Sequence, residues 1–165
     1  MKKLLIQQQV FSWRDRFHIM DEDGKECYFA EGELFTFGKK LHVYDTNNDE
    51  RIYIEQKLFS FLPHYYAFAD GELVAEVVKE FSFFRPRYRI EGLGWEVHGN
   101  FLEHEYEIWR DEKIIAVVKK AWLTWGDFYE LEIADDKDEL SALAVLLCID
   151  SAVAQADASV SVSFN

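Results

Sequence analysis

The sequence has few cysteines, which form the disulfides of small secreted domains, and few prolines, which are common in long linkers. Its 165 residues include two cysteines, Cys27 and Cys148, which disfavours a disulfide framework and favours a reducing compartment. Only two prolines are present, which leaves little room for a structureless linker, while 49% of the residues are hydrophobic. A chain of this length buries enough surface for a sizeable core. We therefore expect one domain over residues 1–165.

Basic residues are also scarce. Lysine and arginine together number 18 against 31 aspartates and glutamates, and the formal net charge is −13. Nonspecific nucleic-acid binding needs a basic footprint, so we expect no nucleic-acid partner. A high net charge favours a soluble monomer. The opening MKKLLIQQQV has an apolar stretch too short for a secretory signal, and we expect a cytoplasmic protein.

Only one long apolar run is present, LSALAVLLCIDSAVAQA at residues 140–156. A helix that is apolar on nearly every face is buried in a large core or in a membrane. Asp150 and Gln155 interrupt the run and no basic residue follows it, so we predict no transmembrane segment and a buried helix instead. An acidic stretch at 135–139 suits the start of that helix. The alternation in residues 159–164, SVSVSF, predicts a final strand.

The rest of the chain reads as short strands separated by turns. Asp23-Gly24, Asn47-Asn48 and Asp70-Gly71 are hairpin signals, and they predict an antiparallel meander. The strand-like segments are residues 4–10, 17–21, 26–32, 41–46, 51–59, 65–70, 72–81, 87–92, 95–100, 105–111, 113–120 and 128–134.

An internal repeat joins two parts of this meander. A shift of 41 positions without a gap pairs Tyr65 with Tyr106 and Asp70 with Asp111, and it aligns similar residues on to position 131. Each copy holds a strand, a tight turn, a strand, an aromatic corner and a third strand. Two copies are too few for a propeller, in which a terminal helix also has no place.

The size of the helix favours a barrel of about twelve strands. An eight-stranded barrel has room for side chains alone, whereas a helix with its side chains measures about 10–12 Å across. Seventeen helical residues span roughly 25 Å, a reasonable barrel height. The fold class predicted is therefore mainly β, a closed antiparallel barrel around a central hydrophobic C-terminal helix.

Each copy of the repeat contains Tyr-x-x-x-x-Asp, then Leu or Ile, Val or Ile and Ala, and then Val-x-Lys. Together with the acidic lead into the C-terminal helix, this pattern resembles the LURP-one-related group of the tubby C-terminal-like superfamily, in its bacterial form. The resemblance implies a twelve-stranded barrel around a C-terminal helix. The superfamily also holds tubby domains, which bind phosphoinositides, and phospholipid scramblases. No catalytic residue is characteristic of the group, so the resemblance implies neither an active site nor a cofactor.

Several polar groups are candidates for metal sites. Asp45, Asn47 and Asp49 have the spacing that opens an EF-hand loop, but the required glycine and closing glutamate are missing, so a hairpin turn is favoured. His98 and His104 match no strong zinc spacing and are interpreted as solvated or strand-packed. We expect no metal.

Arg85, Arg87 and Arg89 are the candidate ligand-binding residues. Alternation along a strand puts all three on one face, and the repeat has no matching basic residues, so the stripe is not required by the strand pattern. Three guanidinium groups suit an anionic headgroup or a nucleotide phosphate; pairing with neighbouring carboxylates is the alternative.

Two further features have a structural interpretation. The aromatic cluster is expected in the core rather than as a stacking platform; it comprises Trp95, Trp109, Trp122, Trp125, Phe81, Phe83 and Phe84. Asp150 is a lone carboxylate on the apolar helix, and if buried it needs a partner.

These observations rank three classes of function. The first is a noncatalytic binding or tethering module, peripheral to a membrane if its partner is an anionic lipid headgroup, or else bound to a protein. The second is a carrier of an apolar ligand, which needs the volume that the helix would fill. The third is an enzyme, for which no nucleophile and acid–base set is recognisable in the spacing.

Overall fold

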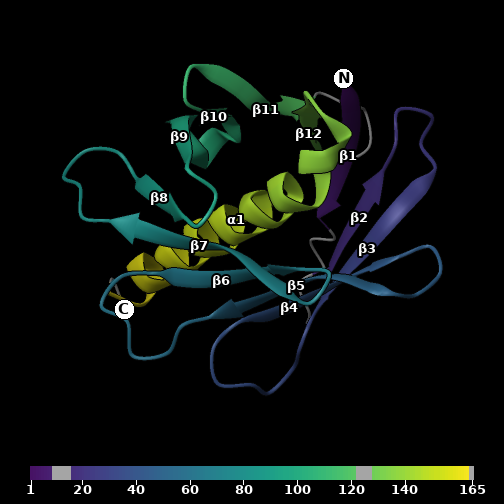
Figure 1. The fold of residues 1–165 in the computed structure, drawn as a ribbon. Helices are drawn as coiled ribbons and strands as arrows, with labels where there is room; N and C mark the ends of the chain where they lie inside the picture. Colours follow the sequence, from purple (N-terminus) through teal and green to yellow (C-terminus); the bar gives the residue numbers. More distant parts are fainter. Residues whose placement is uncertain (9–15, 122–127, 164–165) are drawn as a thin grey trace.

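The structure is a computed structural model that describes residues 1–8, 16–121 and 128–163, the last seven as backbone. Twelve antiparallel strands are followed by one long helix (Figure 1). The strands are β1 Lys2–Gln8, β2 Arg16–Met20, β3 Glu26–Gly32, β4 Lys40–Asp45, β5 Glu50–Gln56, β6 His64–Ala69, β7 Glu72–Glu80, β8 Arg87–Glu91, β9 Trp95–Asn100, β10 Glu105–Arg110, β11 Lys113–Ala121 and β12 Phe128–Ile133. Two short 3-10 helices, η1 Phe101–Glu103 and η2 Asp136–Asp138, and the helix α1 Glu139–Ser163 complete the described chain.

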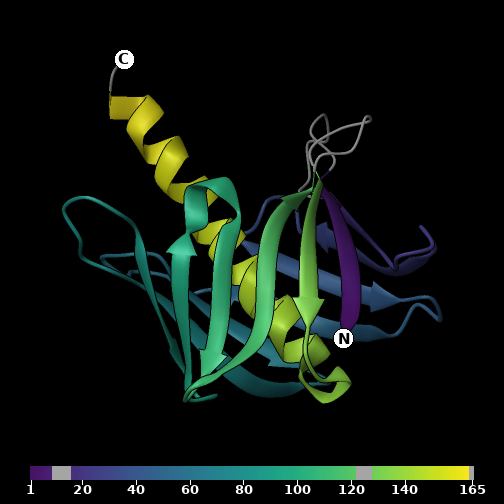
Figure 2. The same cartoon turned by 90° about the horizontal axis from the view of Figure 1, so that it is seen from above.

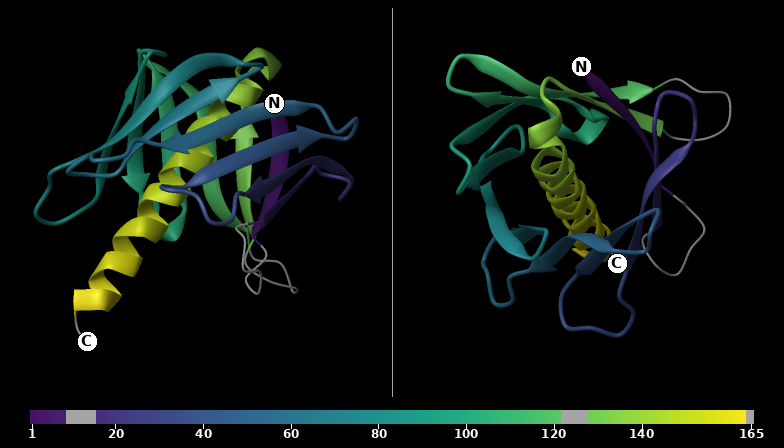
Figure 3. Two further views of the ribbon diagram at one scale, coloured as in Figure 1. Left: turned by 90° about the horizontal axis from the view of Figure 1, so that it is seen from below. Right: turned by 45° about the vertical axis from the view of Figure 1, so that its right-hand side comes forward.

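The strands form one sheet that curls into a barrel. Its order runs from β8 back to β1, then through β12 to β9, and each neighbouring pair is antiparallel. The first and last strands of this order, β8 and β9, lie beside each other, so the barrel is nearly closed. Figure 3 shows α1 inside the ring of strands. The predicted fold class is confirmed.

The helix forms the core of the barrel. Every residue from Ala142 to Ile149 is at most 1% exposed, and α1 packs most closely against β5, β6 and β7. Within the described residues, one stretch, Asp136–Ala156, is long and apolar enough to cross a membrane. Because 67% of its most apolar window is buried in the protein, it is the core of the barrel, and no transmembrane segment is indicated.

Polar contacts fix the start of α1. The Arg110 guanidinium lies 2.6 Å from an Asp138 carboxylate oxygen, and Glu139 accepts a hydrogen bond of 2.8 Å from the Tyr28 hydroxyl. Lys2 pairs with the same Glu139 at 2.5 Å. The helix therefore enters the barrel at the end where β1 begins, and burial together with the Glu139 contact raises the pKa of Tyr28 well above its usual range.

The 41-residue repeat is visible in the backbone. The β6–β7 pair has a bulge between Ala67 and Phe68, and the β10–β11 pair has one between Ile108 and Trp109, which is the same position in the second copy. The two tight turns that follow both begin with an aspartate at positive φ. In the first, Asp70 at 48° and Gly71 at 82° match the two positive φ values of a type I′ hairpin turn.

The predicted final strand is wrong. The backbone of residues 159–163 continues α1, which ends at Ser163, and residues 164–165 lie outside the described chain. A thirteenth strand would need a free sheet edge, whereas β8 and β9 already lie against each other. Helix propagation instead satisfies one backbone hydrogen bond for each residue added.

Candidate functional site

The predicted arginines lie at the start of β8. Along this strand Arg87 and Arg89 point outward, while Tyr88 and Ile90 are buried, as the alternation predicts. Arg85 comes before the strand, in the loop that leads from β7, and it is exposed. The three guanidinium groups therefore extend from the loop onto the outer face of β8.

Carboxylates engage one of the three arginines. Arg89 lies 2.8 Å from Glu91 and 3.3 Å from Glu80, so the alternative interpretation, pairing with neighbouring acids, applies to it. Arg85 and Arg87 form no ion pair within the described part of the chain. Both line a surface hollow of about 340 Å³, together with Phe81, Ser82, Phe83 and Phe84.

The phenylalanines of this hollow are not in the core. Phe81, Phe83 and Phe84 are 70%, 83% and 98% exposed, so the core prediction is wrong for them. They lie in the loop 81–86, where the alternation of a strand does not apply. The same prediction is correct for Trp95, which is 3% exposed. Trp109 is half-buried, and Trp122 and Trp125 lie outside the described residues.

Two more loops present phenylalanines in the same way. We call residues 33–39, 57–63 and 81–86, which join β3 to β4, β5 to β6 and β7 to β8, the aromatic loops. Because consecutive strands run antiparallel, all three connections lie at one end of the barrel. Exposed in the first two loops are Phe35, Phe37, Phe59 and Phe61, at 103%, 90%, 105% and 96%.

Two of these phenylalanines share an unusual backbone conformation. Phe35 and Phe59 occupy the left-handed region, with φ of 59° and 58°, at equivalent places 24 residues apart. Aromatic residues rarely adopt this conformation, and it has a cost. The first two loops also pack together, since a Cβ built on Gly38 would lie 2.7 Å from the Leu58 side chain. Gln56 accepts a 2.9 Å hydrogen bond from the Lys39 backbone N–H, so these loops have defined shapes.

The candidate metal groups have structural roles. Asp45 accepts backbone hydrogen bonds from Asn47 and Asp49 at 2.9 and 3.2 Å, which closes the β4–β5 turn as predicted. Desolvation raises the pKa of Asp45, but these backbone bonds and the contact with Arg51 lower it overall. His98 contacts Glu96 at 3.2 Å, whereas His104 contacts Asp150. No group of three metal-ligating side chains occurs within residues 1–8, 16–121 and 128–156.

Asp150 is buried and has a partner. His104 Nε2 lies 2.7 Å from an Asp150 oxygen, and the imidazole stacks on the Tyr129 ring with centroids 4.5 Å apart. His104 itself has a φ of 54°, which turns η1 into β10. The contact ties the middle of α1 to the β9–β10 connection, and it supplies the partner that a buried carboxylate requires.

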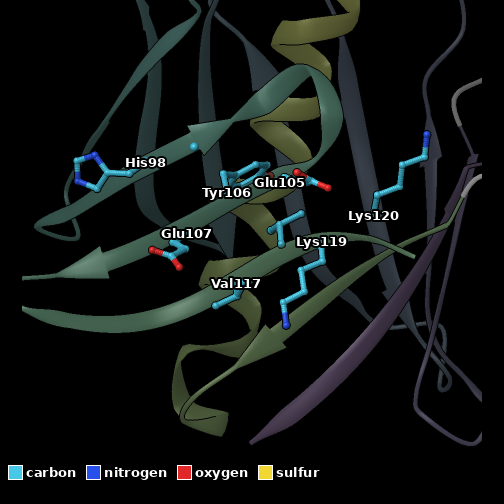
Figure 4. Close-up of a pocket in the computed structure, with 9 residues that line it drawn as sticks. His98, Glu105, Tyr106, Glu107, Val117, Lys119 and Lys120 are labelled. Atoms are coloured by element: carbon cyan, nitrogen blue, oxygen red, sulfur yellow. The ribbon is translucent and has the colours of Figure 1, made fainter. Parts of the chain in front are cut away.

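A second hollow of about 590 Å³ lies over β9, β10 and β11 (Figure 4). Its lining side chains do not converge on one point: His98 and Glu107 lie at one side, while Lys120 extends away at the other. Lys119 pairs with Glu132 at 3.0 Å. Tyr106 is buried, and desolvation raises the pKa of its phenol well above the usual value. This arrangement offers no acid–base pair positioned around a substrate.

Known proteins resemble this chain along most of its length. The family model described as LURP-one-related matches residues 2–150. The uncharacterized protein YxjI of Bacillus subtilis (strain 168) is 38% identical over 150 residues, which span 91% of this chain and 93% of that protein. The X-ray structure of a protein from Arabidopsis thaliana superposes with a TM-score of 0.58 over 88% of this chain and 89% of that one. At 14% identity the last likeness concerns the fold alone.

Proposed function

The chain belongs to the LURP-one-related family, and from this premise we propose that it is a noncatalytic binding module that holds an anionic group at its surface. The ligand class is a phosphate-bearing headgroup such as that of an anionic phospholipid. Arg85 and Arg87 bind the headgroup, and Arg89 borders the site. The protein works as a monomer on the cytoplasmic side of a membrane.

The observation that carries this proposal is that two exposed arginines of an acidic chain form no ion pair with a carboxylate of the described residues. With 31 acidic residues available, arginines such as Arg51, Arg89 and Arg110 contact carboxylates. Arg85 and Arg87 are exposed beside a hollow and have no such contact among the described residues. Guanidinium groups bind phosphate oxygens through paired, charge-assisted hydrogen bonds, so two arginines that line one hollow without an ion pair suit a phosphate.

The core of the barrel argues against a carrier of an apolar ligand. Such a carrier needs an interior volume, whereas α1 lies there with its residues 142–149 at most 1% exposed. An enzyme finds little support either, because the hollow over β9, β10 and β11 lacks a converging set of catalytic groups. A protein partner at the second hollow is the alternative, and its mixture of lysines and glutamates suits a polar surface.

The proposal is tested with a soluble lipid. Dihexanoyl phosphatidylglycerol, kept below its micelle-forming concentration, is titrated into the full chain and followed by calorimetry or NMR. Replacing both arginines, Arg85→Glu with Arg87→Glu, should weaken binding at least tenfold, because charge-assisted bonds contribute about 1.5–3 kcal/mol each.

The matched control is Lys25→Glu with Lys113→Glu, which makes the same charge change on two exposed lysines at the opposite end of the barrel. We expect this variant to bind like the wild type. A wild-type chain that ignores the lipid, or equal losses in both double variants, would refute the proposed site.

A further inference from the structure

We propose that the three aromatic loops form a bilayer-docking face, which inserts its phenylalanines into the headgroup region of an anionic membrane. The inference deepens the proposed function and rests on it for the anionic character of the bilayer. It adds that the partner is the lipid surface itself, with the rings as anchors beside Arg85 and Arg87.

The first argument is the location of the exposed phenylalanine side chains. Seven phenylalanines of the described chain are exposed, and all seven lie in the aromatic loops. Six of them are at least 83% exposed, so little of their surface is covered by the rest of the protein. Exposed apolar side chains gathered in one region mark a site of interaction with a protein or a membrane.

The second argument is the common orientation of the loops. All three lie at the end of the barrel opposite to the start of α1, whose Glu139 contacts Tyr28 near the beginning of β3. Near its other end, Gln155 accepts a hydrogen bond of 3.0 Å from Tyr65, at the start of β6. Figures 2 and 3 show the backbone of α1 continuing past the strands at this end. The aromatic loops and the helix end therefore face the same way.

The third argument is charge. At the aromatic end, the described connections 33–39, 57–63, 81–86 and 101–104 hold three basic and two acidic residues, a net charge of +1. At the other end, the connections between strands and before α1 hold two basic and ten acidic residues, a net charge of −8. Those twelve are Asp21, Glu22, Asp23, Lys25, Asp49, Asp70, Asp111, Glu112, Asp135, Asp136, Lys137 and Asp138. An anionic surface attracts the first end and repels the second.

The shape of the face favours lipid over a protein partner. Phe81 and Phe83 contact each other with ring centroids 5.0 Å apart, but near-complete exposure means that most of the rings stand separately. The core of a protein interface is a closely packed patch. Separate apolar tips enter a headgroup layer readily, because lipid conforms around each one, and the fixed loop shapes lower the ordering cost of binding.

The test measures partition of the full chain onto vesicles of phosphatidylcholine with 30% phosphatidylglycerol, and onto vesicles of phosphatidylcholine alone. Three double variants remove rings in pairs: Phe35→Ser with Phe37→Ser, Phe59→Ser with Phe61→Ser, and Phe83→Ser with Phe84→Ser. We expect each to lower the partition coefficient on anionic vesicles about tenfold, because partly burying two rings contributes that much. Since the rings are exposed, the thermal unfolding midpoint should stay unchanged.

The matched control is Leu73→Ser with Ile114→Ser, which removes apolar side chains that are 50% and 40% exposed at the acidic end. It should bind vesicles like the wild type. The Phe35/Phe37 and Phe59/Phe61 variants should also bind soluble dihexanoyl phosphatidylglycerol normally, because their rings lie outside the hollow that Arg85 and Arg87 line.

Three results would overturn the docking face. The first is wild-type partition in all three phenylalanine variants; if the soluble lipid still depends on Arg85 and Arg87, the anion site stands without it. The second is equal binding to neutral vesicles. The third is self-association in analytical ultracentrifugation that the phenylalanine variants abolish, which would assign the face to a second copy of the chain.

Discussion

Truncation of Leu146 tests whether the barrel really closes around α1. The side chain is 0% exposed and its helix packs against β5, β6 and β7. Leu→Ala in a core costs about 2–5 kcal/mol, and more where the surroundings cannot collapse into the space. Strands paired on both sides cannot move inward freely, so we expect a loss of about 4 kcal/mol in the free energy of unfolding for Leu146→Ala.

Urea unfolding measures this loss. With a slope of about 2 kcal/mol per molar urea, the midpoint should fall by about 2 M with the slope unchanged. Leu102→Ala is the control, because Leu102 is 54% exposed and its removal should change stability by less than about 0.5 kcal/mol. Benzene should restore part of the midpoint in the Leu146 variant alone, because a dry apolar cavity accepts it. A loss below about 1 kcal/mol would contradict the tightly filled barrel.

Two further predictions concern close packing and pH. Gly99→Ala should lower the free energy of unfolding, measured in urea, by about 1–3 kcal/mol more than Gly24→Ala does. A Cβ on Gly99 would lie 2.4 Å from the Glu105 carbonyl oxygen, whereas a Cβ on Gly24 would have nothing within 4 Å. Equal losses in the two variants would refute this prediction. Burial lowers the pKa of His42, but its bonds to Glu50 and Glu33 raise it overall. The stabilisation that protonated His42 gives the folded state is complete below the unfolded pKa of about 6.5, and it disappears as pH rises through the folded pKa. His42→Gln should therefore lower the free energy of unfolding more at pH 6 than at pH 9.

Periodicity predicted the framework well. Each of the twelve strand segments expected before residue 135 corresponds to an observed strand, because alternation reports a wall with one buried face. The helix was located by its all-round apolar surface, and its burial follows from the same property. The failure at 159–163 has a physical cause: alternation predicts a strand only where a partner edge exists, and here the sheet was already complete.

The candidate site was predicted less completely. Alternation placed Arg87 and Arg89 on the outer face, but it could not show that Glu80 and Glu91 engage Arg89, since those contacts depend on the fold. The exposed rings were missed because aromatic residues usually pack in a core. A usable signal was present: Phe-Thr-Phe at 35–37 recurs as Phe-Ser-Phe at 59–61, between strands and close to Gly38 and Pro63.

The net charge of −13 does not by itself oppose docking on an anionic membrane. A seven-residue strand is about 23 Å long and, tilted as in a barrel, separates the two ends by roughly 18 Å. This is about twice the Debye length of roughly 8 Å at physiological ionic strength, so salt screens most of the repulsion from the acidic end. At about 10 mM salt the Debye length is roughly 30 Å and the repulsion reaches the membrane.

Removing two of those acids, Asp21→Asn with Asp23→Asn, should therefore strengthen vesicle binding at 10 mM salt and leave it nearly unchanged at 150 mM. The two residues lie in the β2–β3 turn, at the end away from the aromatic loops. Equal strengthening at both salt concentrations would mean that this turn contacts the membrane, and the proposed orientation would be reversed.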